Sequence, residues 1–286
     1  MADNTYHTHI SAKHRWLDLN LKEVWQYRDL NYLFTKRNFV VSYKQTILGP
    51  AWIFLTPLFS SIVQAFVFGG IAGIETDGVP MLLFYLCSNA IWAYFSSCLI
   101  NNANTFTANA FVFGKVYFPR LVMPVSTVLS KLIDFAIQYG FFLIFLVIYG
   151  LTGAAIRPNW LILLTPLLLL QLAMLSLGCG VIISAATTKY RDLRMLVAFG
   201  VQLWMYASPV AYDMFSMSAF APGGKYYSLY MLNPVTPIVN LFRYAYLGLG
   251  QGDWQPYGSS WAVTCGLLFA GIVLFSRVEK TFMDTV

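Results

Sequence analysis

The sequence predicts an all-α membrane protein that crosses the bilayer several times. Of its 286 residues, 58% are hydrophobic and only 10% are charged, whereas an average soluble protein carries about 25% charged residues. The mean hydropathy is +0.62. Several uncharged runs reach the roughly 20 residues that a helix needs to cross the hydrocarbon core. We therefore expect a polytopic protein with six transmembrane helices and an amphipathic interface helix before them.

The first 48 residues are polar enough to remain outside the membrane core. Residues 1–15 are expected to form a flexible tail. The N-terminal region lacks the apolar core of a cleavable signal peptide. Residues 16–48 are expected to form an amphipathic helical region at the membrane surface. Arg37 and Lys44 lie seven residues apart, on one side of such a helix. The pair Gly49-Pro50 marks the point where the chain turns into the membrane.

Six spans are expected in a transmembrane domain that covers residues 49–276. Span five is broken at Ser208-Pro209. Gly69, Gly70 and Gly73 could form a small-residue face for close helix approach, although ordinary glycines at a helix end explain them equally well. Residues 277–286 form a short tail. The expected spans are residues 51–71, 81–101, 121–151, 160–185, 195–212 and 260–276.

The connection before span six is unusual because it is neither polar nor a plain span. Residues 226–250 carry one charge, Arg243, and are interrupted by Asn233-Pro234 and Pro237. Such a run suits short re-entrant helices in the outer membrane face, which are tolerated where they pack on protein or line a cavity.

The positions of the cations predict the topology. With the N-terminus inside, the cytoplasmic segments hold fourteen of the eighteen Lys and Arg residues, and the outer segments hold three. The remaining one, Lys131, lies inside span three. This distribution follows the positive-inside rule and places both termini in the cytoplasm. The net charge of +6 is therefore not evidence for nucleic-acid binding.

The sequence lacks the motifs of most enzymes. No Gly-x-x-x-x-Gly-Lys-Ser/Thr loop is present, and no His, Cys or carboxylate cluster is spaced to hold a metal. A membrane-embedded enzyme would need buried acid–base groups, but the three histidines all precede residue 15. We expect no cofactor in this chain. Lys131 and Asp134, three residues apart, are expected to form a structural ion pair rather than a proton relay.

Aromatic residues and interfacial cations are the remaining candidates for function. Sugar rings stack on aromatic faces without requiring charge, so the aromatic residues of the spans could line a conduit, although an interfacial aromatic belt explains most of them. The cations of residues 28–44 could neutralise a lipid phosphate or pyrophosphate, or could simply follow the positive-inside rule. The candidates for the conduit are Trp52, Phe59, Trp92, Tyr94, Trp204 and Tyr206. The candidate phosphate contacts are Arg28, Lys36, Arg37 and Lys44.

Five segments, in order, resemble a known family of transporters. They are RDLNYLFTKRNFVVSYKQTILGPAWIFLTPL (28–58), FGKVYFPRLVMP (113–124), KYRDLRMLVAFGVQLWMYASPVAY (189–212), LNPVTPIVNLFRYAYLG (232–248) and FSRVEKTFMD (275–284). Together they resemble the transmembrane subunits of ABC-2 type permeases that export polysaccharides such as O-antigen, capsule and teichoic acid. The likeness covers nearly all of the chain after residue 25.

This resemblance implies a mechanism that spacing alone does not. Two copies would form the channel in the bacterial inner membrane, and two separate ATPase subunits would bind ATP and Mg and drive transport. The substrate would be a glycan on undecaprenyl pyrophosphate or a similar lipid, with O-antigen the favoured polymer. Capsule or teichoic acid remains the alternative, and a small lipid or drug is a weaker one.

The resemblance also implies roles for particular segments. Residues 104–119 match the coupling helix that contacts the ATPase, and residues 226–250 match the re-entrant periplasmic gate helices. The cationic segment lies near the lateral substrate entrance. The coupling candidates are Phe106, Phe111, Phe113, Lys115 and Tyr117. The gate candidates are Asn233, Pro234, Phe242 and Arg243.

Overall fold

The computed structural model describes residues 21–281, apart from residues 75, 77, 117, 191, 216–219, 221, 251 and 253. Every regular element within these residues is a helix, as the composition predicts. The expected N-terminal tail, the coupling candidate Tyr117 and the last five residues lie outside the described part of the chain.

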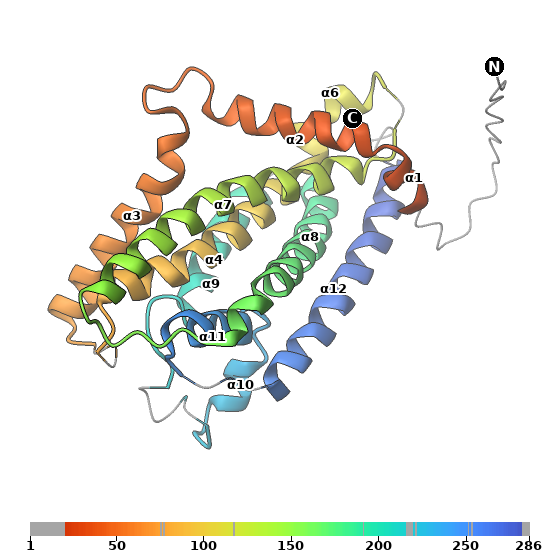
Figure 1. Cartoon of the computed structure of the whole chain (residues 1–286). Helices are drawn as coiled ribbons and strands as arrows, with labels where there is room; N and C mark the ends of the chain where they lie inside the picture. The colour runs from red at the N-terminus through yellow and green to blue at the C-terminus, as the bar shows by residue number, and fades with distance from the viewer. Residues whose placement is uncertain are drawn as a thin grey trace, which may run out of the picture.

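A helix lies across one end of the bundle, which we call the inner end (Figure 1). After α1 (Leu21–Gln26), α2 (Arg28–Tyr43) runs along α7 and buries Asn31 and Phe34. A loop and a short 3-10 helix, η1 (Gly49–Ala51), then lead into α3 (Trp52–Gln64). The Gly-Pro corner therefore lies where the sequence predicts it.

Five helices among the described residues are long and apolar enough to cross a membrane. A sixth apolar helix, α9 (Leu193–Tyr206), has 14 residues. An α-helix of that length is about 21 Å long, which is shorter than a hydrocarbon core of about 30 Å. The prediction of six full spans therefore stays a prediction. The five are Gly49–Ile71 (α3 with the π-helix η2, Ala65–Ile71), Met81–Ala103 (α4), Val122–Leu151 (α7), Trp160–Thr188 (η3, Trp160–Leu164, with most of α8, Thr165–Lys189) and Trp254–Val278 (within α12, Trp254–Thr281).

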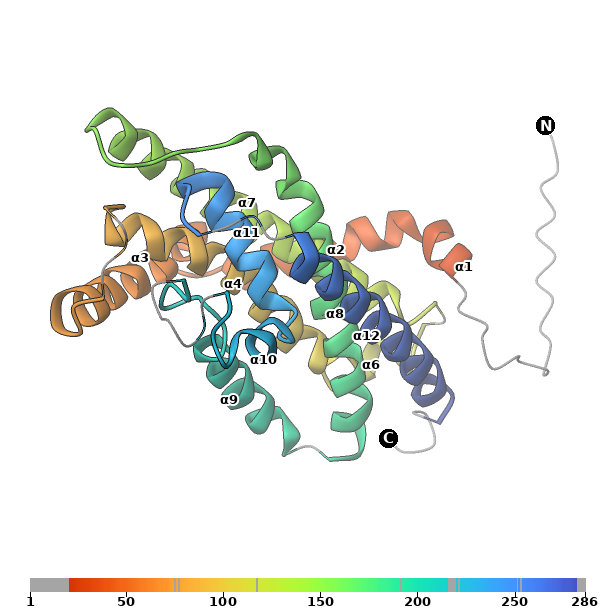
Figure 2. The same ribbon diagram turned by 90° about the horizontal axis from the view of Figure 1, so that it is seen from below.

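Helix α4 is the centre of the bundle. In the apolar 18-residue stretch of α4, 78% of the residues are buried inside the protein. In the corresponding stretches of the spans formed by α3, α7 and α12, only 17% are buried. Helices α3, α7, α8, α9 and α11 all pack against it, and Figure 2 shows it between α3 and α8. A helix that is apolar on all sides is stable where other helices surround it. The apolar outer faces of α3, α7 and α12 remain for lipid or a second chain.

Glycines allow α8 to approach two neighbours closely. A Cβ added to Gly178 would lie 2.8 Å from the backbone of Leu268 in α12, and one on Gly271 would lie 2.7 Å from the carbonyl oxygen of Gly178. A Cβ on Gly180 would lie 2.5 Å from Asn102 in α4. The glycines at 69, 70 and 73 do not bring two backbones of this chain together in this way, since a Cβ on Gly69 would meet the flexible side chain of Met81 and one on Gly73 would meet nothing within 4 Å.

The opposite end, which we call the outer end, is closed by two short helices (Figure 1). These are α10 (Tyr227–Met231) and α11 (Val235–Leu247), and they are separated at Asn233-Pro234 as the sequence predicts. Helix α11 is buried along almost its whole length and packs on α4, α8 and α12. It ends at Gly248, which adopts a φ of +74° that favours glycine.

Candidate functional site

The four cations proposed for phosphate contact are all exposed along α2 and the loop that follows it. The guanidinium of Arg37 lies 4.7 Å from the centre of the Phe34 ring, and its Nη2 donates to Asn38 Oδ1 over 3.1 Å. From Arg28 to Lys44 the helix rises about 24 Å. One pyrophosphate therefore cannot contact all four residues. Arg28 and Lys44 must serve different ends of this surface.

Below α2, an inner aromatic cluster joins three segments of the chain. Its members are Phe34, Phe106, Phe113, Phe118 and Phe275. The rings of Phe106 and Phe275 stack at 4.5 Å, and those of Phe34 and Phe118 lie 5.7 Å apart. The cluster ties α2 to the connection between α4 and α7 and to the end of α12.

That connection is the predicted coupling segment, and it forms two short helices, α5 (Thr105–Ala108) and α6 (Ala110–Phe113). Phe106 and Phe113 are buried within the inner aromatic cluster, so neither presents its ring to a partner. Phe111 is 73% exposed, and Lys115 Nζ lies 3.8 Å from the centre of its ring. Of the predicted coupling residues that the structure describes, Phe111 and Lys115 are thus the accessible ones, and the two buried rings support them from behind.

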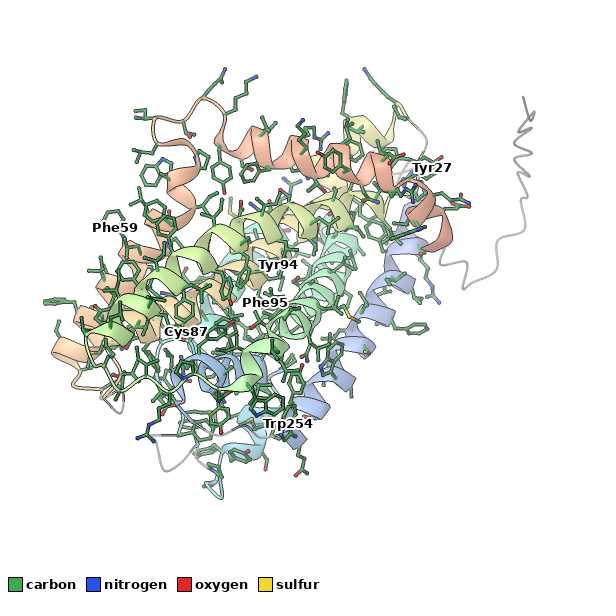
Figure 3. All side chains as sticks on the ribbon, viewed as in Figure 1. Tyr27, Phe59, Cys87, Tyr94, Phe95 and Trp254 are labelled. Carbon is green, nitrogen blue, oxygen red and sulfur yellow. The ribbon has the colours of Figure 1, made fainter. Side chains whose placement is uncertain are left out.

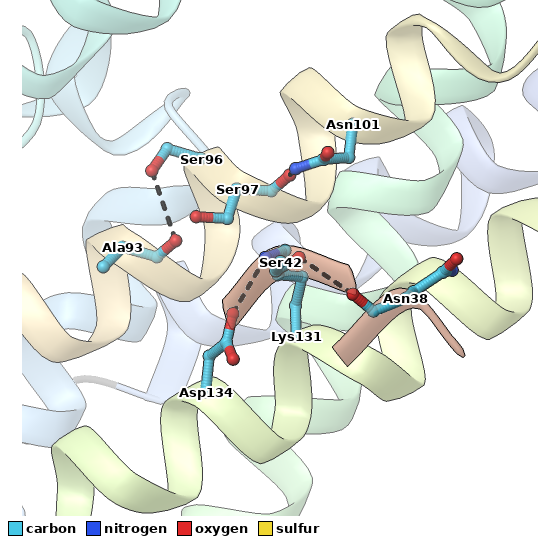
Figure 4. Close-up of polar contacts among 8 residues, drawn as sticks. All are labelled: Asn38, Ser42, Ala93, Ser96, Ser97, Asn101, Lys131 and Asp134. Atoms are coloured by element: carbon cyan, nitrogen blue, oxygen red, sulfur yellow. Dashed lines mark hydrogen bonds and ion pairs between the residues drawn. The ribbon is translucent and has the colours of Figure 1, made fainter. Parts of the chain in front are cut away.

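An inner cavity of about 280 Å³ lies below the end of α2, between α3, α4 and α7. The predicted ion pair lies in its wall: Lys131 Nζ donates to Asp134 Oδ2 over 2.8 Å (Figure 4). Tyr43 of α2 lies beside Asp134. Burial raises the pKa of Tyr43 above its usual value, and the carboxylate of Asp134 raises it further, so this phenol is neutral at pH 7.

Five of the six proposed conduit residues divide into two groups, and the sixth, Trp204, is bonded to Asn233 at the outer end. Trp52, Phe59 and Tyr206 are about half exposed, and Trp52 lines the inner cavity. Trp92 and Tyr94 are buried, because α4 is enclosed by its neighbours, although Tyr94 also lines the inner cavity. Figure 3 shows Tyr94 in the middle of the bundle and Phe59 at its margin. Within one chain, Trp92 does not face a conduit.

A polar cluster between α3 and α4 is a feature that sequence reasoning missed. The amide of Asn89 donates to Ser61 Oγ and to Gln64 Oε1, both over 2.8 Å. Ser61 and Gln64 lie three residues apart in an apolar span, so they share one face. That spacing was a usable signal, but the partner Asn89 lies 25 residues further on. The cluster fixes the position of α3 against the central helix.

At the outer end, Arg243 of α11 is a buried cation that holds another segment in place. Its side chain is 2% exposed and lies 3.9 Å from the centre of the Phe84 ring. Its Nε donates to Ser88 Oγ over 2.8 Å, and its guanidinium donates to the carbonyl oxygens of Pro209, Val210 and Tyr212. The count of Lys and Arg residues used to predict the topology assigns Arg243 to an outer segment, but the structure places its side chain in the core.

Asn233 joins the end of α9 to the start of α11. Its Oδ1 accepts hydrogen bonds from Trp204 Nε1 and from the backbone of Val235, over 3.0 and 3.1 Å. Its amide donates to Ser208 Oγ over 2.8 Å. Pro234 directly precedes α11, and Phe242 is buried beside the rings of Phe142 and Tyr246. The predicted gate residues therefore form one packed and hydrogen-bonded unit.

An outer cavity of about 530 Å³ opens beside this unit. Its walls are mainly aromatic and apolar, and Trp204 and Asn233 take part in them. The lining is completed by Ala207, Phe220, Tyr226, Leu229, Tyr230 and Pro234. Among the described residues, no group of three His, Cys, Asp or Glu side chains could hold a metal ion. Both cavities offer aromatic faces and uncharged polar groups, and the wall of the inner cavity also holds the ion pair of Lys131 and Asp134.

Comparison with known proteins identifies the family. The ABC-2 type transporter family matches residues 30–247. The chain is 24% identical over 267 residues to an O-antigen export system permease protein, RfbA, of Myxococcus xanthus, which covers 93% of this chain and 98% of that protein. It is 25% identical over 257 residues to a protein of the same name from Klebsiella pneumoniae, which covers 90% and 94%. This multi-pass membrane protein therefore belongs to the ABC-2 type transporter family.

Proposed function

We propose that this protein is the permease subunit of an ABC transporter that exports a lipid-linked polysaccharide, with O-antigen the favoured polymer, across the inner membrane. The observation that carries the proposal is the end-to-end match to permeases of O-antigen export. The similarity to three such proteins extends over 90–93% of this chain and 94–98% of theirs. A match of that extent includes both ends of the bundle as well as its spans.

The motor acts in trans. The chain lacks a phosphate-binding Gly-Lys loop, so ATP and Mg bind to a separate ATPase subunit. The surface that would receive it is the inner end. There, the exposed ring of Phe111 and the cation of Lys115 project beside α2, and the inner aromatic cluster connects them to α2 and α12. A displacement of α6 would therefore move three elements together.

Two copies enclose the path. The outer faces of α3 and α9 are apolar and exposed, and both helices flank the central α4. A second copy that covers these faces would place Trp52, Phe59 and Tyr206 around a shared conduit. An uncharged aromatic wall suits a long polar chain, because strongly binding sites would arrest it.

The cytoplasmic side is the inner end. The described ends of the chain, α1 and the end of α12, both lie there (Figure 1), and the positive-inside rule places that end in the cytoplasm. The exposed cations of α2 then lie at the cytoplasmic headgroups. Neighbouring ones such as Lys36 and Arg37 can contact the phosphates of a lipid carrier.

The test is a deletion of the gene in its own host, followed by complementation. We expect the surface polysaccharide to disappear and its lipid-linked precursor to accumulate inside, and the intact gene should restore export. Deletion of the partner ATPase gene should give the same phenotype. The structure of the accumulated polymer separates O-antigen from capsule and teichoic acid. Unchanged surface polysaccharide with an altered membrane-lipid or drug profile would contradict the proposal.

A further inference from the structure

The inner cavity has the size and the walls of a site for one small ring. Its volume of about 280 Å³ lies just below the range for pockets that hold drug-sized ligands, about 300–1,000 Å³. Aromatic side chains from three helices form part of its wall: Trp52 of α3, Tyr94 of α4 and Phe135 of α7. Trp52 is 46% exposed, so the cavity is open on the side of α3.

Several polar groups in this wall lack a partner. Gln138 Oε1 and Asp134 Oδ1 are buried oxygens without a hydrogen bond in the described part of the chain. Asp134 as a whole is only 9% exposed. Ser97 also lines the cavity. Its backbone carbonyl oxygen accepts from Asn101 Nδ2 over 2.7 Å, and the hydroxyl of the neighbouring Ser96 donates to the carbonyl oxygen of Ala93 over 3.3 Å (Figure 4). Buried polar atoms are nearly always paired. The two unpaired oxygens, Gln138 Oε1 and Asp134 Oδ1, therefore indicate a ligand that supplies hydrogen-bond donors.

The charge of the cavity decides which kind of ligand fits. Lys131 is its cation, and it is already paired with Asp134 over 2.8 Å. The remaining unpaired atoms, Gln138 Oε1 and Asp134 Oδ1, are acceptors, which repel a phosphate. They would accept hydrogen bonds from hydroxyl groups. A sugar ring offers hydroxyl donors on its edge and an apolar C–H face for the aromatic side chains.

We propose that the inner cavity binds one sugar ring, and that this ring is the first unit of the glycan next to its lipid carrier. The inference rests on the proposed function and names what the permease recognises. The cavity lies directly below Tyr43 and the last turn of α2. A ring held there is within reach of a lipid pyrophosphate at the exposed cations of that helix. The phosphates and the sugar are thus bound by separate groups.

The experiment uses the purified permease–ATPase complex in lipid nanodiscs. ATP hydrolysis is measured against increasing polyprenyl pyrophosphate that carries one sugar, and again with bare polyprenyl pyrophosphate. We expect Ser97→Ala and Gln138→Leu each to raise the half-stimulating concentration of the sugar-bearing lipid about two- to tenfold, the effect of one lost neutral hydrogen bond. The half-stimulating concentration of bare lipid should not shift, because bare lipid carries no ring to occupy the cavity.

Ser96→Ala is the matched control, because this hydroxyl bonds to its own helix and does not line the cavity. It should leave both curves unchanged. Equal curves for Ser97→Ala and the parent, or an equal shift with bare lipid, would overturn the sugar assignment. A parent complex that responds to neither lipid would contradict the proposed function instead.

A second measurement tests the site without hydrolysis. Saturation-transfer NMR on the same complex reports contact with methyl glycosides of glucose, galactose, mannose and N-acetylglucosamine. We expect at least one glycoside to give a signal that Gln138→Leu weakens and Ser96→Ala does not. Signals that are identical in all three proteins, or absent from all, would refute the site. A signal from the free glycoside also separates recognition of the ring from recognition of its lipid.

Discussion

Arg243 is the residue on which the outer end of the bundle depends most. A guanidinium remains charged in proteins, and this one is buried with four hydrogen-bond partners from two segments. We expect Arg243→Met to leave three carbonyl oxygens without this donor and to destabilise the protein, because each buried acceptor left unsatisfied costs about 1–3 kcal/mol. The measurement is the apparent melting temperature of the purified protein in detergent, which should fall by several degrees.

Lys225→Met is the control for this prediction. It also removes a cation near the outer end, but Lys225 is exposed and only touches the face of Tyr226 at 5.6 Å. Its melting temperature should change little. If Arg243→Met has the same melting temperature as Lys225→Met, the guanidinium does not hold residues 209–212.

Local pairs at the residue scale were predictable, and distant ones were not. Lys131 and Asp134 share one helix and are separated by less than one turn, so spacing alone predicted their contact. The partners of Arg243 lie 31 to 155 residues away, and no local pattern indicates them. The same holds for Asn89 with Ser61 and Gln64.

The segment formed by α5 and α6 separates two roles that the sequence could not distinguish. Phe113 is 5% exposed and lies in the inner aromatic cluster, whereas Phe111 is 73% exposed. Truncating a buried Phe costs about 3–5 kcal/mol, but an exposed substitution usually changes stability by no more than about 0.5 kcal/mol. We expect Phe113→Ala to lower the melting temperature, and Phe111→Ala to leave it unchanged while it uncouples ATP hydrolysis from export.

Both variants are measured in the same two assays, melting in detergent and export of polysaccharide in the complemented host. The exposed Val116 of the same connection provides Val116→Ala as a control for surface loss alone. Full export by Phe111→Ala would show that this ring is not the contact with the ATPase.

Helix positions followed from the sequence because each span is a local apolar run. The expected spans 81–101 and 121–151 agree within two residues with α4 and α7. The fifth span was expected to continue to Tyr212, but α9 ends at Tyr206. The chain turns there, and its next residues are held by hydrogen bonds from Asn233 and Arg243. The close approach of α8 and α12 at Gly178 and Gly271 was not predicted, since a glycine in a span looks the same whether or not another backbone faces it.

At the scale of the whole molecule, the centre of the bundle was also hidden from the sequence. The spans have similar composition, and only the packing shows that α4 is surrounded while α3 and α9 are open on one side. This explains why Trp92 on α4 lies in the core, although the same residue type at Trp52 on α3 is half exposed. Composition predicts which segments enter the membrane, but the arrangement of helices decides which face reaches a conduit.

The open faces of α3 and α9 predict where a second copy binds. Phe59 of α3 and Phe199 of α9 are 56% and 59% exposed. Each lies about 9–11 Å along its helix from the inner end, so the two residues are at similar depth. In a two-fold dimer, α3 of one copy can then meet α9 of the other, and the contact occurs twice. We expect the double variant Phe59→Cys, Phe199→Cys to form a covalent dimer on mild oxidation in membranes.

The background for this experiment carries Cys265→Ser, because Cys265 is the exposed cysteine among the four. Phe269 of α12 is equally exposed, but α12 packs on α8, on the side of the bundle away from α3 and α9 (Figure 2). The pair Phe269→Cys, Phe199→Cys should therefore remain monomeric on a denaturing gel. If that pair cross-links as efficiently as the first, collision in the membrane explains the disulfides, and the interface lies elsewhere. A specific cross-link would place Trp52 and Tyr206 of both copies around one path, which is the arrangement that an exported chain requires.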